Sequence, residues 1–515
     1  MQHRPAAAVA LVAAGALVSA LALAARSGRA DDPKDNPARP RDPAADAVGA
    51  KDVPKERPEQ KLTDHDRSPV FDPTKPAPLT KALKGQPKEG RVLGFDFARD
   101  PLNGDRPFQP FAEIMKTESE QKPKVMAAQR KLLESRYDLT PKFDPEMKMS
   151  RGKPICVGPT ARLAGGMTWD KLAGMSPADV KKANAFPYPS LPHPLHTNGG
   201  QVVPPMQTAM FPRLERFDVD FDVPEAFLPE FPPAIFLQNR PELGDVSRGQ
   251  VLHLGNFRDL FKEILTPVQL EGLRLLLTPL PQEEFNLTDD RKSPLPQQGI
   301  ACLDCHVNGH TSAAFHLSPD IRPQDRRFRL DTTSLRGVFN QQIHGSKRSL
   351  RSVEDFTEFE QRTAYFNGDP IRPMKKGFQE LPRSVIPFMA QAQNMFDFPP
   401  APKLNVLGRL NDTASESERR GEKLFFGKAN CAVCHPAPFY LDDKMHDLHL
   451  ERFLNEPGDG PIKAFTLRGI KDSPPYMHDG RCLTLEDTVE FFNLVLQTRL
   501  NQQEKLDLVA FLRQL

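Results

Sequence analysis

Two short stretches decide what this chain is built around: CLDCH at residues 302–306 and CAVCH at residues 431–435. Both have the form Cys-x-x-Cys-His, which places two thiols and one imidazole on a single turn. In this motif two thioether bonds hold a porphyrin, and the histidine becomes an axial ligand of its iron. The sequence therefore predicts two covalently bound haem c groups, with His306 and His435 as proximal iron ligands. The thiols that attach them would be those of Cys302, Cys305, Cys431 and Cys434.

Two other chemistries also use paired cysteines. A thioredoxin-like redox motif needs one pair near a strand and has no need of a histidine after both copies. A structural zinc site can be built from two separated pairs, but the stretch between Cys305 and Cys431 far exceeds the spacing of zinc ribbons. Haem attachment is therefore the favoured interpretation. The remaining cysteines, Cys156 and Cys482, could pair, stay buried or be free thiols, and the sequence does not decide.

The regions after the two motifs resemble each other. Residues 333–360 align with residues 465–492, and the alignment pairs Arg336 with Arg468 inside a shared Leu-Arg-Gly. A repeat of this kind predicts a mainly α fold with tandem duplicated cytochrome c-type haem domains, at 256–400 and 401–515. A guanidinium can hold a carboxylate by two hydrogen bonds, so Arg336 and Arg468 are candidates for binding haem propionates. Ordinary surface arginines are the alternative.

The N-terminal half has a different composition. Residues 31–150 are rich in Pro, Lys, Asp and Ala, and such a stretch cannot bury enough apolar surface to fold, so it is predicted to be a disordered tether. Residues 151–255 combine Pro-rich turns with alternating apolar residues, which predicts an irregular extension with short strands.

Residues 1–30 indicate export. A basic start is followed by an Ala-, Leu- and Val-rich run from Ala6 to Ala25, as in a secretory signal peptide. The run is about as long as the roughly 20 residues that span a membrane, so an uncleaved anchor is the alternative. The chain is predicted to be periplasmic. Its 69 basic and 67 acidic residues nearly cancel, which argues against a nucleic-acid partner.

Three segments carry a family resemblance: RRGEKLFFGKANCAVCH (419–435), FTLRGI (465–470) and PPYMHDGRCLTLEDTVEFF (474–492). Over roughly 295–515 the chain resembles the di-haem bacterial cytochrome c peroxidases and the related MauG enzymes. The resemblance implies that peroxide reacts at a first haem, held by His306. A second haem, held by His435, would pass on electrons from a small cytochrome c or cupredoxin.

The resemblance also implies further ligands. A calcium ion between the haems would draw on Asp331 and on the carbonyls of Ser473 and Pro475. The second haem would take Met or Tyr fourteen residues after His478, but that position is Phe492, which cannot bind iron. The sixth ligand would then be Met477 or Met445, or the iron would be five-coordinate.

The first domain departs from the family as well. The inter-haem tryptophan has no counterpart, because the matching segment at residues 343–348 reads IHGSKR. The histidine expected after the first haem could be His310 or His316. Peroxide cleavage needs a group that moves a proton, and His316, Glu358 and Glu360 are candidates, with solvated helix-face side chains as the alternative for the glutamates.

These features support three hypotheses. The first is a peroxidase that reduces hydrogen peroxide with electrons from a small redox protein. The second is a di-haem electron carrier whose irons are both six-coordinate. The third is a MauG-like oxidase that acts on a protein or organic substrate. A homodimer is compatible with each of them.

Overall fold

The computed structural model describes the chain in segments, all of which lie in the compact unit Arg67–Leu515. The unit Met1–Asp66, including the predicted signal peptide, lies outside the described residues. The described segments are 91–92, 95–96, 111–163, 165–191, 222–278, 301–313, 315–317, 329–346, 350–361, 381–456 and 458–515.

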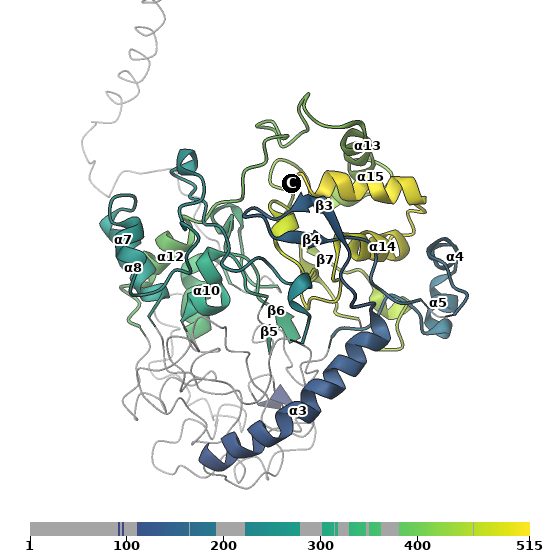
Figure 1. Ribbon diagram of the computed structural model, residues 1–515, viewed down its shortest axis with the longest axis horizontal. Helices are drawn as coiled ribbons and strands as arrows, with labels where there is room; N and C mark the ends of the chain where they lie inside the picture. Colours follow the sequence, from purple (N-terminus) through teal and green to yellow (C-terminus); the bar gives the residue numbers. More distant parts are fainter. Residues whose placement is uncertain are drawn as a thin grey trace, which may run out of the picture. The chain divides into compact units, whose positions relative to one another are not determined.

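The fold is largely helical with a few short strands, as predicted (Figure 1). Within the described segments the strands form four antiparallel pairs, β1–β2, β3–β4, β5–β6 and β7–β8. The α-helices are α3 (Phe111–Arg136), α4 (Trp169–Ala173), α5 (Pro177–Ala183), α7 (Phe257–Phe261), α8 (Pro267–Leu276), α9 (Cys302–Cys305), α10 (Val353–Glu360), α12 (Ile386–Gln393), α13 (Glu416–Phe425), α14 (Leu485–Val495) and α15 (Gln502–Leu512). The strands are β1 (Arg91–Val92), β2 (Phe95–Asp96), β3 (Phe143–Lys148), β4 (Pro154–Cys156), β5 (Phe315–Leu317), β6 (Arg329–Asp331), β7 (Met445–His446) and β8 (Ile462–Lys463).

The first Cys-x-x-Cys-His motif rests on a core formed by α7, α8 and α12. Leu303 of the motif is buried in this core together with Leu273 and Met389. At Gly272 a Cβ atom would lie 1.8 Å from the carbonyl oxygen of Phe388, so only glycine lets α8 approach α12 this closely. The first motif therefore packs, through Leu303, against the core that this close helix pair forms.

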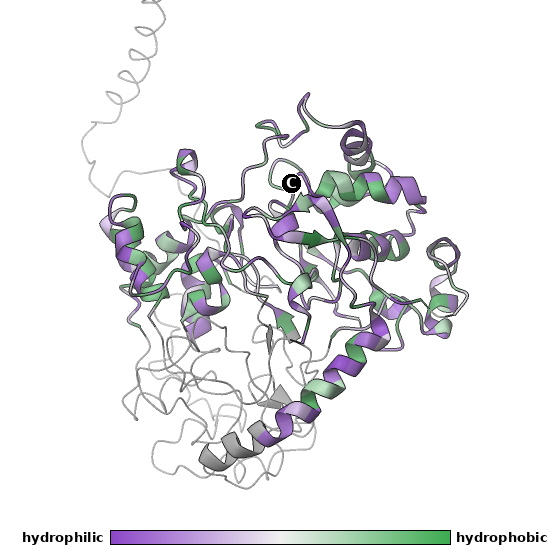
Figure 2. Cartoon of the chain, in the orientation of Figure 1, coloured by the Kyte–Doolittle hydropathy of each residue, from purple (hydrophilic) through white to green (hydrophobic). Residues whose placement is uncertain are grey.

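The second motif follows α13, which packs against α15. A Cβ atom at Gly421 would lie 1.9 Å from the carbonyl oxygen of Asp507, so these helices also meet at a glycine. Phe425, Tyr440 and Phe511 make edge contacts within the core, with ring centroids 5.3 to 6.2 Å apart. Figure 2 shows green, apolar stretches on α8 and α15 and a largely purple, polar α3.

Residues of the N-terminal half, which precedes both motifs, share this second core. Leu133 of α3 is buried in it, although α3 lies within the segment whose composition predicted a tether. The Tyr137 hydroxyl donates a hydrogen bond to the carbonyl oxygen of Arg481 (2.6 Å), which lies 344 residues further along the chain. The composition-based prediction could not include such a long-range contact. None of the helices in the described segments is long and apolar enough to cross a membrane.

Candidate functional site

The first motif is a single turn with an anchored histidine. In α9 the Asp304 carboxylate accepts a hydrogen bond from the backbone N–H of Ala301 (2.7 Å), and the N–H of His306 donates to the carbonyl of Cys302 (3.1 Å). His306 Nδ1 lies 2.7 Å from the carbonyl oxygen of Thr333. A carbonyl only accepts, so the ring proton sits on Nδ1 and Nε2 carries the lone pair that iron would bind.

The second motif repeats this arrangement. The N–H of His435 donates to the carbonyl of Cys431 (2.9 Å), and Nδ1 of its ring lies 2.9 Å from the carbonyl oxygen of Tyr440. The Tyr440 hydroxyl in turn donates to the carbonyl of Gly408. Burial lowers the pKa of His435, which keeps the imidazole neutral and able to bind a metal. Both motif histidines are therefore oriented by backbone carbonyls.

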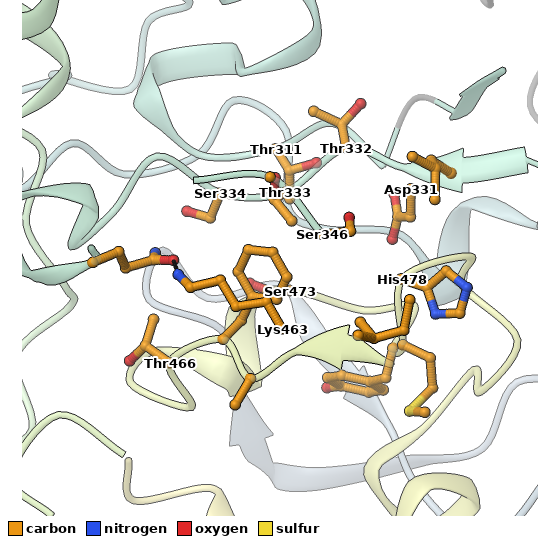
Figure 3. Close-up of a pocket in the computed structure, with 18 of the residues that line it drawn as sticks. Thr311, Asp331, Thr332, Thr333, Ser334, Ser346, Lys463, Thr466, Ser473 and His478 are labelled. Carbon is orange, nitrogen blue, oxygen red and sulfur yellow. Dashed lines mark hydrogen bonds between the residues drawn. The ribbon is translucent and has the colours of Figure 1, made fainter. Parts of the chain in front are cut away.

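Both motifs line one cavity of about 490 Å³. Figure 3 shows Asp331, Thr332, Thr333 and Ser334 on one side of it, and Lys463, Thr466 and Ser473 on the other. Such a volume lies within the range of cofactor pockets, about 300–1,000 Å³. The predicted site residues that line the cavity are Cys302, Cys305, His306, Asp331, Arg336, Glu360, Cys434, His435, Arg468, Ser473, Pro475 and Met477.

The donor set fits a c-type haem at each motif. All four motif cysteines are free thiols, so no disulfide competes for them. Burial raises the pKa of Cys431 to about 12. Burial, followed by Asp304, Cys302 and Glu360, raises the pKa of Cys305 well above its usual value. Each motif thus brings two thiols and one imidazole together on a single turn, which are the groups that haem attachment requires.

The sequence repeat is also a backbone repeat, with equivalent residues 132 positions apart (468 − 336). Gly337 and Gly469 have φ 76° and 72°, both with ψ 13°. An isolated bridge joins His344 to Leu350, and its equivalent joins Tyr476 to Cys482. The next helices, α10 and α14, begin at equivalent caps, Ser352 and Thr484. That each repeat holds a haem stays a prediction.

The paired arginines line the cavity but are held by protein groups. Arg336 Nη1 donates to Asp472 (3.1 Å) and Nη2 to the carbonyl of Ala234 (2.7 Å). Its Nε is buried without a hydrogen-bond partner among the described residues. Arg468 Nε donates to the Leu515 carbonyl (2.8 Å). The propionate role predicted for both arginines remains compatible with this geometry.

The two candidate histidines after the first motif differ in position. His310 is buried, with Nδ1 2.8 Å from Ser334 Oγ and Nε2 2.9 Å from the carbonyl of Asp472. Both ring nitrogens are thus occupied, and burial, followed by the charge of Arg336, lowers the pKa of His310 to about 3. His316 lies on β5, where its backbone pairs with Leu330. Its side chain lies outside the described residues.

The remaining candidates separate into two groups. Glu360, Met477 and Phe492 line the cavity. Glu358, by contrast, pairs with Arg383 (2.5 Å). Met445 pairs on β7 with Lys463 of β8. The described residues Cys431, Met445 and Glu358 are not among those that line the cavity.

Sequence reasoning missed two groups at this site. Asp472, in the second repeat, is buried and accepts hydrogen bonds from Ser150 (Oγ, 2.5 Å) and from Arg336, so it connects the N-terminal half to the first repeat. Lys463 is a buried lysine in the cavity wall. One sequence signal could have identified Lys463: the repeat alignment pairs it with Asp331.

Comparisons with known proteins agree with the motifs. Part of the chain is 32% identical, over 120 residues, to the methylamine utilization protein MauG of Methylorubrum extorquens, covering 19% of this chain and 34% of MauG. Another match, to the cytochrome-c peroxidase IdrP1 of Pseudomonas sp. strain SCT, is 27% identical over 150 residues and covers 19% of this chain and 40% of IdrP1. Part of this chain is thus related to the MauG and cytochrome-c peroxidase proteins.

These relationships are partial. The chain spans between a third and two fifths of the length of the two curated relatives. No family model matches it. Among solved structures, a MauG-like protein associated with microbial copper homeostasis is 22% identical, with a TM-score of 0.32, over 42% of this chain and 81% of that protein.

Proposed function

We propose that this protein is an exported di-haem c-type cytochrome that reduces hydrogen peroxide with electrons from a small redox protein. The observation that carries the proposal is that both Cys-x-x-Cys-His motifs face one cavity of about 490 Å³, and that each motif is followed by one copy of the duplicated backbone. The partial matches to MauG and IdrP1 support it. The small redox protein would be a cytochrome c or a cupredoxin.

Each residue of the motifs has a defined task in this proposal. The four thiols would attach two porphyrins, and Nε2 of His306 and His435 would bind the irons. Bound haem supplies one-electron redox chemistry and, where an axial position is open, a place for peroxide to bind. The carbonyls of Thr333 and Tyr440 fix the imidazole rings and make the iron-binding nitrogens more basic.

Proton transfer falls to a carboxylate in the cavity. Glu360 lines the cavity and lies close enough to Cys305 to contribute to the raised pKa of that thiol. A carboxylate there could accept a proton from one peroxide oxygen and return it to the other. Glu358 is less suited because it is already paired with Arg383. Glu360 is therefore the proposed acid–base group, with His316 as the alternative.

The geometry favours Met477 over Met445 as a sixth ligand of the second iron. Met477 lines the cavity with φ 73°, a left-handed conformation that suits glycine, and the equivalent residue in the first repeat is Gly345, with φ 83°. A bulky residue kept in such a conformation commonly marks a functional constraint. A thioether ligand would also raise the reduction potential of that haem.

Calcium, if bound, would lie where Asp331, Ser473 and Pro475 border the cavity. The N–H of Asp331 donates to the carbonyl of His478 (2.9 Å), so the carboxylate of the first repeat is held beside a loop of the second. This contact between the repeats supports the calcium proposal.

The decisive experiment uses the full chain with both haems attached. We expect rapid oxidation of the reduced protein by hydrogen peroxide in stopped-flow absorbance and a high-spin, cyanide-binding iron in electron paramagnetic resonance spectra. Replacing Glu360 by Gln should slow the peroxide step by about 10²-fold or more, the usual range for general acid–base catalysis. Two low-spin irons that ignore cyanide in every redox state, with no turnover, would instead indicate an electron carrier.

A further inference from the structure

Asp331 and Lys463 occupy equivalent positions in the two repeats, since each lies five residues before its paired arginine (336 − 331 and 468 − 463). Asp331 ends β6 and Lys463 ends β8. The N–H of Asp331 donates to the carbonyl of His478 (2.9 Å), and the N–H of Lys463 donates to the carbonyl of Ser346 (2.8 Å). Since Ser346 and His478 are equivalent too, the two hydrogen bonds cross between the repeats reciprocally.

Each of the two side chains is also tied to the iron-binding histidine of its own repeat. Asp331 lies two residues before Thr333, whose carbonyl lies 2.7 Å from His306 Nδ1. Lys463 lies two residues before Phe465, whose backbone also hydrogen-bonds His435. Asp331 thus lies two residues from the backbone group that contacts the first motif histidine, and Lys463 lies two residues from one that contacts the second. Both charged residues line the cavity (Figure 3).

The ammonium of Lys463 is held inside the protein. Its side chain is 0% exposed, and its Nζ lies 3.1 Å from Gln341 Oε1 and 3.3 Å from Asp443 Oδ1. The Asp443 side chain is 29% exposed, so water screens its charge more than that of the ammonium. The ammonium also lies 5.1 Å from the centre of the Phe465 ring. The second repeat thus presents a positive charge where the first presents a carboxylate.

We propose that this exchange of charge sets the order of the two haem reduction potentials. The inference rests on the two-haem part of the proposed function. A carboxylate stabilises the more positive, oxidised iron and lowers the potential of the first haem, whereas an ammonium destabilises it and raises the potential of the second. A single electron from a donor then resides on the second haem and leaves the first iron oxidised.

The test measures both midpoint potentials of the full, two-haem chain by spectroelectrochemical titration in the presence of a calcium chelator. Lys463→Met should lower the potential of the second haem and so narrow the difference between the two midpoint potentials. Lys463→Arg keeps the charge and should leave the potential of the second haem near the wild-type value. Asp331→Asn should raise the potential of the first haem. A variant without the second haem, Cys431→Ala with Cys434→Ala, assigns the two transitions.

The outcomes separate this inference from the function it rests on. Two outcomes would overturn the inference alone in a protein that carries two haems. In the first, Lys463→Met leaves the difference between the two midpoint potentials unchanged. In the second, Lys463→Met shifts the potential of the first haem more than that of the second. Haem content below two per chain would overturn the proposed function and the inference together. Absence of peroxide turnover with the predicted shifts would remove the peroxidase activity and keep the charge assignment.

Discussion

The two repeats share a backbone but have different surroundings. Asp487 at the start of α14 is buried and accepts hydrogen bonds from the N–H groups of Thr160 and Ala161 (2.7 and 3.0 Å). Its equivalent, Asp355 at the start of α10, is only partly buried and faces Arg383 (3.4 Å). The N-terminal extension covers this helix start in the second repeat and replaces solvent there. One backbone can therefore hold two different sites, because neighbouring segments set the burial of each.

The strongest test of the repeats removes one haem at a time. Cys431→Ala with Cys434→Ala should halve the haem content, and Cys302→Ala with Cys305→Ala should do the same, since each motif supplies its own thiols. Pyridine haemochrome absorbance per chain measures this. Cys156→Ala is the control, because that buried cysteine lies outside both motifs. Loss of both haems from either double variant would contradict independent attachment.

The paired arginines should differ in their effect on stability. Arg336→Ala leaves the buried Asp472 without its ion-pair partner and should lower the free energy of unfolding by about 3–5 kcal/mol. Arg468→Ala removes one hydrogen bond to the Leu515 carbonyl and should cost about 1–2 kcal/mol. Denaturant titration of the haem-loaded protein measures both. Equal losses of unfolding free energy in the two variants would show that the two arginines stabilise the fold equally.

A cluster of Asp459, His478 and Arg481 is found in the second repeat only, and its stability is expected to depend on acid pH. Burial opposes ionisation of Asp459, but Arg481, His478 and Ser190 together lower its pKa to about 2. The positions equivalent to His478 and Arg481 are Ser346 and Ser349, so the first repeat lacks these partners.

This lowered pKa predicts a pH dependence. Since the pKa of Asp459 is lower in the folded than in the unfolded chain, its stabilisation is complete above about pH 4 and is lost as the pH falls through about 2. Between these pH values the wild-type protein should lose roughly 2–3 kcal/mol of unfolding free energy through protonation of Asp459. Asp459→Asn should not show this part of the loss. Unfolding followed by circular dichroism across this range tests it. An unchanged slope in the variant would contradict the assignment.

The smallest effects concern the helix caps. Ser352→Ala should destabilise the protein by about 1 kcal/mol, since the side chain accepts one hydrogen bond, from the N–H of Asp355. Thr484→Ala should cost about 2 kcal/mol, because its hydroxyl also donates to the carbonyl of Gly158 (2.9 Å). Thermal unfolding compares them. Equal losses would mean that the Gly158 contact adds nothing.

Local features of the site could be predicted from sequence. The two motifs, the repeat and the turn at Leu-Arg-Gly depend on residues a few positions apart, so their spacing is visible in the chain itself. The contact of Ser150 with Asp472, which are 322 residues apart, gives no such signal. The choice between His310 and His316 stayed open for the same reason, because the partner of His310 Nε2 is the distant Asp472 carbonyl.

The sequence by itself determined the chemistry: four thiols and two imidazoles at the spacing of haem attachment, in a chain that repeats itself. This is possible because thioether attachment needs groups on a single turn. Only the tertiary structure decided that both motifs share one cavity, and that Lys463 and Asp331 line it at equivalent positions. Burial and electrostatic screening depend on every segment packed around a residue, and those segments come from distant parts of the chain.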